Sequence, residues 1–219
     1  VPKKHLKQMK SNANFSIKRC RELEKTLNHD VIAFTTNVSE NIGKPASRWL
    51  HFGLTSSDII DTAFAVQMNE SLKVLIADVK KLRKVIGTKA RKHKFTPMIG
   101  RSHGIHAETS TFGLKILGYY EENKRNLVRI KKSIEQIKTI QMSGPVGTYS
   151  NIDQRVEKIV AKKLKFKIEP VSTQIIPRDR HAELFSSFSI IASSLDRLAT
   201  EIRHLQRTEV LEVEEGFGK

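Results

Sequence analysis

The chain has few of the residues that build cross-linked, membrane-spanning or linker-rich proteins. Its 219 residues include one cysteine (Cys20), one tryptophan, 11 glycines and 6 prolines. A single cysteine excludes an internal disulfide framework and a thiolate metal cluster, and it favours a reducing, cytoplasmic setting. No uncharged stretch approaches the ~18 residues that cross a bilayer, and residues 1–5 lack the apolar stretch of a secretory signal. We therefore expect no membrane partner.

Basic residues outnumber acidic residues by 39 to 23, which gives a formal net charge of +16. A field of that sign favours nucleic acid, an anionic membrane surface or a polyanionic metabolite as a partner. A lysine-rich solvated surface explains the same count, because most lysines fall on polar faces of the expected helices. The chain lacks the long runs of one charge that are typical of nucleic-acid-binding tails. Composition alone leaves these alternatives open.

Three long segments repeat apolar residues at alternating steps of three and four, the period of a helix with one apolar face. They run from Ser57 to about Lys92, from about Glu108 to Met142, and onward from near His181. Helices of this length, roughly 45–50 Å, need partners along their whole length. The pattern therefore predicts an all-α, long-helix bundle with coiled-coil-like packing that continues across subunits.

Shorter helices are expected at Ser16–Leu27, Asp30–Ile42 and Asn151–Leu164. Asp30 is a predicted N-cap, and Gly43 is a predicted helix stop. No segment shows sustained alternation of apolar and polar residues, so we expect no half-buried strand. Residues 165–173 are the stretch most suited to an extended conformation, because a proline interrupts any helix there.

The first of four polar connections, residues 49–58, places Thr55, Ser56 and Ser57 at the start of a long helix. Hydroxyls and free backbone N–H groups at a helix N-terminus favour an anion site. Simple capping by Ser57 or Asp58 explains the same residues.

The second connection, residues 96–108, contains His103 and His106 together with an arginine, a hydroxyl and two glycines. Small residues allow the backbone to approach a ligand closely, and histidine exchanges protons near neutral pH. The spacing of the two histidines also permits a metal site on a helix, although no third ligand is evident.

The third connection, residues 143–150, is rich in turn-forming residues. The fourth, residues 172–181, places the amide of Gln174 and two guanidinium groups before the third long helix. Both can be interhelical turns with a salt bridge. Four polar connections in one bundle nevertheless favour a site for an anionic ligand.

Several of these segments resemble a known family. Thr55–Ala63 and Gly100–Glu108 are similar to the first two motifs of the fumarase/aspartase superfamily. Within it the chain is most similar to the adenylosuccinate lyase family, and the segments that carry this similarity are His29–Phe34, Arg48–Ser56, Ser172–Gln174 and Arg178–His181. The resemblance covers nearly all of the chain. Argininosuccinate lyase and aspartase are the alternatives within the superfamily, and the run from Gln174 to His181 argues against them.

The resemblance implies elimination of fumarate from adenylosuccinate to give AMP, and from the succinyl-aminoimidazole-carboxamide ribotide of purine synthesis. A base takes a proton beside a carboxylate, fixed donors stabilise the enolate-like charge, and an acid protonates the departing nitrogen. No cofactor and no metal are expected. The implied partners are an anionic small-molecule substrate and three further copies, in a homotetramer whose active sites are shared between subunits.

The resemblance also assigns roles to residues. His103 matches the general acid. The implied substrate-binding positions are Asn28, His29, Asp30, Thr55, Ser56 and Gln174, with His29 also supporting catalysis. Further support near the site is expected from His51, Ser57, Ser102 and His106. Structural alternatives remain, because His29 can cap a helix and His51 can fill the space beside Trp49. Ser102 departs from the family pattern, which usually has threonine there.

The resemblance further implies an incomplete chain, with part of a small helical N-terminal domain at 1–54 and part of the central bundle at 55–219. Members of the family continue beyond the position of Lys219 into a mobile loop that carries the base serine. We therefore expect the 219 residues alone to be inactive. A function of a different class, a basic helical scaffold that binds nucleic acid, leaves the histidine and hydroxyl motifs without a role.

Overall fold

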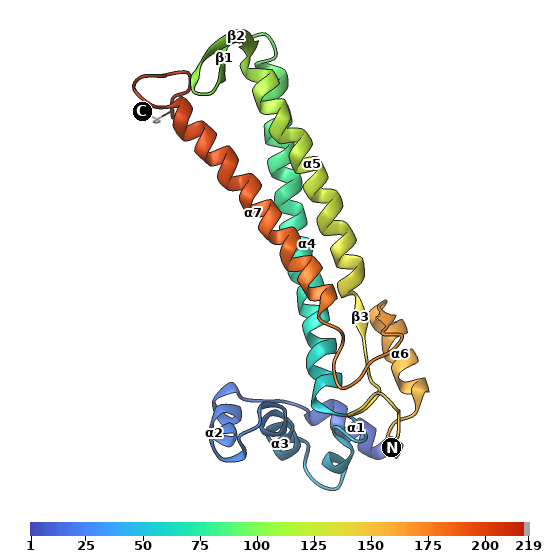
Figure 1. Ribbon diagram of the computed structural model, residues 1–219. Helices are drawn as coiled ribbons and strands as arrows, with labels where there is room; N and C mark the ends of the chain where they lie inside the picture. Colours follow the sequence, from blue (N-terminus) through green and yellow to red (C-terminus); the bar gives the residue numbers. More distant parts are fainter. Residues whose placement is uncertain (217–219) are drawn as a thin grey trace. The chain divides into compact units, whose positions relative to one another are not determined.

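The computed structural model describes residues 1–216 and consists mostly of helices (Figure 1). It divides into two compact units. Unit 1 combines Val1–Ala63 with Ile140–Ile176, and unit 2 combines Phe64–Thr139 with Pro177–Lys219. The predicted domains, 1–54 and 55–219, are a different division and stay a prediction; residues 217–219 of the second lie outside the described residues.

Unit 1 contains four short α-helices, a 3-10 helix and a minimal strand pair. The elements are α1 (Lys3–Asn12), α2 (Ile17–Leu27), α3 (Asp30–Ile42), η1 (Ala46–Trp49), α6 (Gln154–Leu164) and β4 (Lys167–Ile168), which pairs with β3 (Thr139–Ile140). Val38, Ile42 and Ala46 form a small core against Met9 and Leu50. The extended conformation expected within 165–173 is confirmed at β4.

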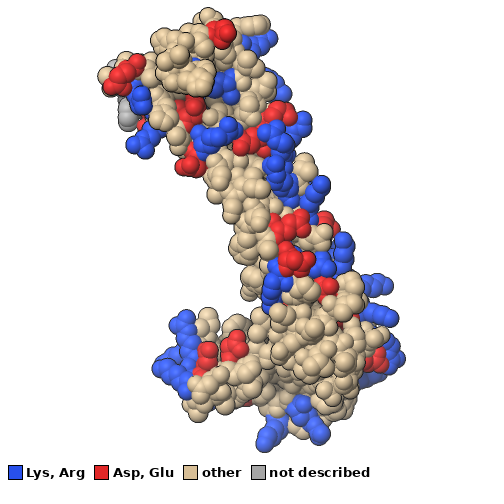
Figure 2. All heavy atoms as spheres, viewed as in Figure 1, with Lys and Arg blue, Asp and Glu red and all other residues tan. Residues whose placement is uncertain are grey.

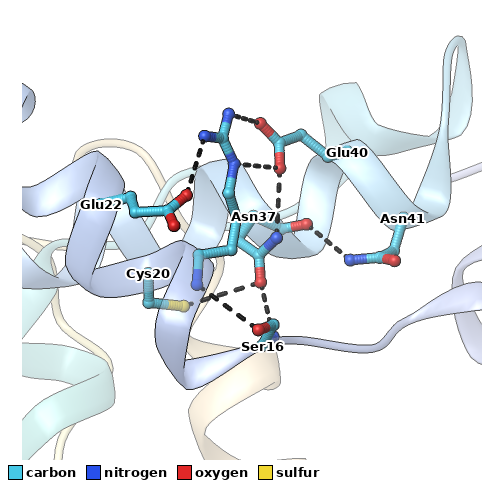
Figure 3. Close-up of polar contacts among 7 residues, drawn as sticks. Ser16, Cys20, Glu22, Asn37, Glu40 and Asn41 are labelled. Carbon is cyan, nitrogen blue, oxygen red and sulfur yellow. Dashed lines mark hydrogen bonds and ion pairs between the residues drawn. The ribbon is translucent and has the colours of Figure 1, made fainter.

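The contact between α2 and α3 is built around the buried amide of Asn37 (Figure 3). Its Oδ1 accepts a hydrogen bond from the Ser16 N–H at 2.8 Å, and its Nδ2 donates to Glu40 at 3.1 Å. Arg19 reaches across from α2 and pairs with Glu40, which lowers the pKa of that carboxyl group. The Cys20 thiol lies 3.7 Å from Asn37 Oδ1. The polar end of α2 is therefore held to α3 by side chains.

Unit 2 consists of three long helices and a β-hairpin. The elements are α4 (Ser56–Lys92, whose first residues belong to unit 1), β1 (Pro97–Ser102), β2 (Ile105–Thr111), α5 (Phe112–Ile137) and α7 (Asp179–Leu205). The three helices run side by side (Figure 1) and bury the predicted apolar stripes, among them Leu72, Val79, Leu127, Ile130, Ile137, Leu184 and Ile191. The predicted mostly helical class is thus confirmed. Within residues 1–216 none of the helices has the length and apolar character needed to cross a membrane.

The hairpin corrects the expectation that no segment forms a strand. Pro97–Thr111 forms two antiparallel strands joined by the two-residue turn His103–Gly104, whose φ angles are +54° and +78°. Positive φ at both central residues is the requirement of a type I′ turn. Met98 is the only buried side chain of the two strands, so the sequence carries no alternation to reveal them. The second long helix therefore begins at Phe112, later than the predicted Glu108, and ends at Ile137 rather than Met142.

Two helix starts also differ from expectation, and one helix is additional. The N-cap of α3 is His29, and the predicted cap Asp30 is the first helical residue. Helix α6 begins at Gln154, capped by Asp153, so residues 151–153 precede it. Helix α1 was not predicted. The stop at Gly43 is confirmed, because its N–H donates the last helical bond to the Ser39 carbonyl and its φ of +76° turns the chain out of the helix.

The packing of unit 2 predicts a large loss of stability when its most buried isoleucine is shortened. Ile130 has no exposed surface, and its replacement by alanine leaves a cavity between the three helices. We expect Ile130→Ala to lower the free energy of unfolding by about 2–5 kcal/mol. Urea unfolding of the full-length protein measures this, with Lys132→Ala on the exposed face of α5 as the control. An Ile130→Ala midpoint no lower than that of the control would contradict this packing.

Candidate functional site

The start of α4 is fixed by the fully buried carboxylate of Asp58. Its Oδ2 accepts hydrogen bonds from the N–H groups of Thr55 at 3.0 Å and Gly144 at 3.2 Å, and its Oδ1 accepts from Ser143 at 3.1 Å. The bond to Thr55 closes a capping box at the helix N-terminus. The bonds to Ser143 and Gly144 attach the third polar connection to the first. Asp58 is the third residue of α4 and not its N-cap, so the predicted capping by Asp58 takes another form: its carboxylate binds the N–H of Thr55, the residue before the helix, and also joins two connections.

Two glycines allow the three connections of unit 1 to touch. A Cβ atom on Gly53 would lie 2.3 Å from the Asn151 carbonyl oxygen, so the first connection contacts the end of the third. A Cβ atom on Gly147 would lie 2.0 Å from the Ser172 carbonyl oxygen, so the third connection contacts the fourth. Both glycines have φ near +75° to +79°, which other residues adopt rarely. Close backbone contact at both points requires glycine.

The fourth connection is held by groups on α4 and by residue 141. Asp61 Oδ2 accepts from the Ile176 N–H at 2.8 Å, and Thr62 Oγ1 donates to the Gln141 carbonyl at 3.1 Å. The Gln141 side-chain amide in turn donates to the carbonyl of Gln174. The Ser143 and Ser172 hydroxyls lie 2.6 Å apart. Helix α4 thus fixes the backbone of the segment that carries Gln174.

His29 is placed at the N-terminus of α3, facing the start of α4. Its Nε2 lies 3.4 Å from Ser56 Oγ, and its Nδ1 accepts from the Ile32 N–H at 3.4 Å. Nδ1 also lies 3.3 Å from the Asp30 carboxylate. The same imidazole caps α3 through Nδ1 and contacts Ser56 through Nε2. Its capping role is therefore compatible with a role in the site.

His51 lies in the same unit with a buried ring nitrogen. Its Nε2 makes no hydrogen bond to any of residues 1–216, and its backbone has a φ of +60°. The Trp49 indole instead donates to His5 at 3.0 Å and contacts the Phe52 ring. A shielded nitrogen without a partner costs free energy unless some other group satisfies it.

Three of the remaining predicted residues of unit 1 are exposed and one is partly buried. Asn28 ends α2 in the left-handed conformation, and the Asp30 side chain is 66% exposed. Gln174 is exposed, and only its backbone has a described contact. Ser57, in the first turn of α4, is partly buried. The structure thus brings His29, Ser56 and Thr55 together, with Gln174 held through its backbone on the same frame.

His103, Ser102 and His106 belong to unit 2, on the exposed hairpin. His103 occupies the turn itself, and Ser102 and His106 lie on the paired strands beside it. Arg101 anchors the hairpin through a 2.7 Å ion pair with Glu212, whose carboxyl pKa is lowered by the guanidinium group. Among residues 1–216 no three histidine, cysteine or acidic side chains converge as a metal site would need. The turn therefore presents an imidazole outward on a fixed support.

Several residues that organise the site were not singled out from the sequence as site residues. Sequence patterns mark Asp58 only as a cap, and they give no signal that Asp61, Gln141 or Ser143 belongs to the site. The spacing of Thr55 and Asp58 matches that of a capping box, which predicts the bond between Asp58 and the Thr55 N–H. It does not predict the bonds from Asp58 to the third connection. The bonds to residues 143 and 144 join positions 85 and 86 apart, which no local pattern reveals.

A pair formed by the partly buried Tyr149 and the buried Glu157 fixes the third connection. The Tyr149 hydroxyl donates to Glu157 Oε2 at 2.8 Å, and Glu157 Oε1 accepts from the Met142 N–H at 2.8 Å. Burial, together with the bond to the carboxylate, raises the pKa of the Tyr149 hydroxyl from 10.0 to about 12. Both oxygens of Glu157, which lies on α6, therefore hold the turn that also binds Asp58.

Comparison with known families decides the relationship of the chain. Residues 2–218 match the model of a family described as lyase. The chain belongs to this lyase family. The matched residues include both units, with the His29–Ser56 contact and the hairpin that carries His103. The predicted family relationship is therefore confirmed.

Relatives in this lyase family are close over the whole chain. The chain is 47% identical to an adenylosuccinate lyase of Bacillus subtilis (strain 168), 46% to one of Thermotoga maritima and 48% to one of Synechocystis sp. (strain PCC 6803). Each comparison covers 100% of this chain and 51% of the relative. The chain thus spans about half the length of the curated relatives it matches. The predicted similarity to adenylosuccinate lyases is confirmed.

Solved structures of the same fold are more distant in sequence. The fumarate lyase of Mesorhizobium sp. BNC1 matches with a TM-score of 0.89 at 26% identity, over 96% of this chain and 51% of that one. A 3-carboxy-cis,cis-muconate lactonizing enzyme of Pseudomonas putida matches with a TM-score of 0.88 at 26% identity, over 96% of this chain and 49% of that one. The arrangement of long helices is thus shared by enzymes with different names.

The three bonds of Asp58 predict that its loss destabilises unit 1 strongly. Asp58→Ala leaves three backbone N–H groups without an acceptor, two of them buried, at about 1–3 kcal/mol each. We expect a loss of about 3 kcal/mol or more in urea unfolding of the full-length protein. The control is Asp153→Ala, which removes an exposed helix cap and should cost less. Equal losses in the two variants would show that the bonds to residues 143 and 144 contribute nothing.

The raised pKa of Tyr149 predicts an alkaline loss of stability. Because the neutral phenol is favoured in the folded state, its contribution is complete below pH 10 and is lost as the pH rises from 10 through about 12. Tyr149→Phe removes this titration. We expect the stability difference between the wild type and Tyr149→Phe, measured by urea unfolding from pH 8 to pH 12, to shrink across that window. A difference that stays constant with pH would mean that Tyr149 is not buried against Glu157.

Proposed function

We propose that the protein to which this chain belongs is an adenylosuccinate lyase, which eliminates fumarate from adenylosuccinate to give AMP. The observation that carries the proposal is the 44–48% identity to four curated adenylosuccinate lyases across all 219 residues. The same enzyme would split succinyl-aminoimidazole-carboxamide ribotide. No metal or cofactor takes part in the proposed reaction.

The reaction needs positive or hydrogen-bonding groups around an anion, and unit 1 supplies several. The Ser56 and Thr55 hydroxyls lie at the N-terminus of α4, where free N–H groups and the helix dipole favour negative charge. In the tautomer with a lone pair on Nδ1, His29 donates from Nε2 to Ser56 Oγ and leaves the serine hydroxyl free to donate to a substrate oxygen. We propose that Asn28, Asp30 and Gln174 contact the same substrate and that Ser57 supports them.

The unpartnered nitrogen of His51 supports a bound ligand in this unit. A substrate that carries a phosphate and two carboxylates has enough oxygens to satisfy Nε2 as a donor. We therefore propose that His51 binds the substrate and is not simply a filler beside Trp49. This role is one of recognition, because proton transfer is assigned elsewhere.

We propose His103 as the general acid that protonates the departing nitrogen. Its place in a two-residue turn fixes the backbone while leaving the imidazole exposed, which suits a group that must reach a substrate. Ser102 and His106 lie on the strands beside it and would orient the ring or the substrate. We further propose, on the family resemblance, that the base lies on a loop beyond residue 219 and that the complete site forms among subunits of a cytoplasmic homotetramer. The 219 residues alone are accordingly expected to be inactive.

Two other activities compete with this proposal. Argininosuccinate lyase and aspartase share the superfamily, and a substrate panel on the full-length protein separates them. Fumarate release, followed by absorbance, should occur with adenylosuccinate and not with argininosuccinate or aspartate. Turnover of either of the other two at a higher kcat/KM would replace the proposal. Salt-sensitive binding of nucleic acid with no fumarate release would favour the scaffold alternative.

The role of His103 predicts a large kinetic effect. In the full-length protein, His103→Ala should lower kcat for adenylosuccinate by about 10²–10⁴-fold, because proton donation to the leaving nitrogen is lost. The control is His204→Ala, which removes an exposed imidazole from α7, and it should keep near wild-type turnover. Circular dichroism checks that both variants are folded. Unchanged turnover in His103→Ala would exclude it as the proton donor.

A further inference from the structure

A basic groove runs along unit 2 between α4 and α5. It has a volume of about 570 Å³, and the cations that line it are Lys80, Arg83, Lys84, Arg91, Lys124 and Lys131. Among the described residues no aspartate or glutamate lines it. Figure 2 shows lysine and arginine side chains gathered along the side of unit 2 formed by α5, while the middle of the α7 side is mostly uncharged. The excess positive charge of the chain therefore has a local concentration on residues that are not among those assigned to the lyase site.

Most of these cations have no counter-charge of their own. Within residues 1–216, Lys80, Lys84, Arg91 and Lys131 make no ion pair or hydrogen bond through their side chains. Lys124 pairs with Glu121 at 3.2 Å, but both side chains are about half exposed, and such pairs contribute little. Like charges held along one groove repel one another. An anion bound there relieves that repulsion.

The floor of the groove is fixed by Arg83 and Tyr120. The Arg83 guanidinium donates from Nη2 to the tyrosine hydroxyl at 2.8 Å and lies 4.8 Å from the ring centre. A Cβ on Gly87 would lie 2.9 Å from the same ring, so the ring rests against the backbone of α4. Arg83 Nε is buried and has no partner among the described residues. The groove thus has a rigid floor with one unsatisfied donor.

The spacing of the cations selects an elongated anion. Lys80 to Arg91 spans eleven residues of α4, or about 16 Å, and Lys131 and Lys124 follow the opposite wall on α5. A single phosphate can reach only the nearest two or three of these groups. A row of linked phosphates can reach both walls along the groove. Nucleic acid fits less well, because Tyr120 is the one aromatic ring among residues 1–216 that lines the groove, and Arg83 already covers that ring.

We propose that this groove binds a linear polyphosphate, meaning phosphates joined by anhydride bonds, either free or as the tail of a nucleoside polyphosphate. The site is separate from the residues assigned to catalysis. A polyphosphate ligand would explain the concentration of cations along this groove. The proposal does not depend on which lyase reaction the protein catalyses.

The test is calorimetric titration of the full-length protein with tripolyphosphate. The variant Lys84→Gln/Lys131→Gln removes one charge from each wall and should weaken binding by about tenfold, since charge-assisted bonds to phosphate are lost. The matched control, Lys81→Gln/Lys132→Gln, removes the same charge from neighbouring exposed positions that do not line the groove, and should change Kd by less than about twofold. Lys84→Arg/Lys131→Arg should retain binding. The KM for adenylosuccinate should be unchanged in the groove variant.

Each outcome bears on the proposal. Titration with ATP distinguishes the two sources, since tighter binding of ATP than of tripolyphosphate assigns a nucleotide, and the reverse assigns free polyphosphate. Absence of tripolyphosphate binding, or equal weakening in groove and control variants, would overturn the proposal. So would tighter, groove-dependent binding of a single-stranded RNA, which would assign a nucleic-acid site. If the double variant loses its helical circular dichroism, the single variant Lys131→Gln provides the same comparison against Lys132→Gln.

Discussion

A carboxylate shielded from water must find hydrogen-bond donors, and Asp58 finds three of them on the backbone of two separate connections. Its position in the first turn of α4 means that one side chain both starts the helix and fixes the loop at 143–144. Asp61 and Thr62, one turn later, hold the next stretch of chain in the same way. The polar first turns of α4 therefore replace a hydrophobic core as the centre of this part of unit 1.

The same physical arrangement explains how Ser56 becomes available. The carboxylate of Asp58 binds backbone N–H groups, while the hydroxyl of Ser56, two residues earlier, contacts His29 on α3. The exposed hairpin of unit 2 follows a different principle, since its strands bury little and depend on the turn and on the Arg101–Glu212 pair. Rigid backbone at both places supports side chains that stay accessible, as a preorganised site requires.

The sequence was most informative where one physical signal dominates. The stripes through Leu72, Ile130 and Leu184 repeat at the helical period and were predicted as core. The hairpin was missed, because a strand that is exposed on both faces has no alternation, and its His103–Gly104 turn replaces the more familiar Asn–Gly pair. The cap of α3 was assigned one residue late, since Asp30 is the commoner cap, yet His29 fills that place.

For the site, motif order identified the residues whose chemistry is distinctive, such as His29 and Ser56. It did not reveal the residues that hold them. Asp58 and Ser143 are ordinary in type, and their importance comes from contacts between distant parts of the chain, which depend on the tertiary fold. The contact of Gly147 with Ser172 has the same origin.

The packing of α2 on α3 also determines what the lone thiol of the chain can be used for. Cys20 is partly buried beside Asn37, at the point where Arg19 and Glu40 join the two helices. A small fluorophore or spin label attached there would enter the polar contact between the helices and would not extend freely into solvent. The rotational freedom of the label would therefore report whether α2 and α3 remain in contact. Because Cys20 is the single cysteine of these 219 residues, the label would need no engineered cysteine.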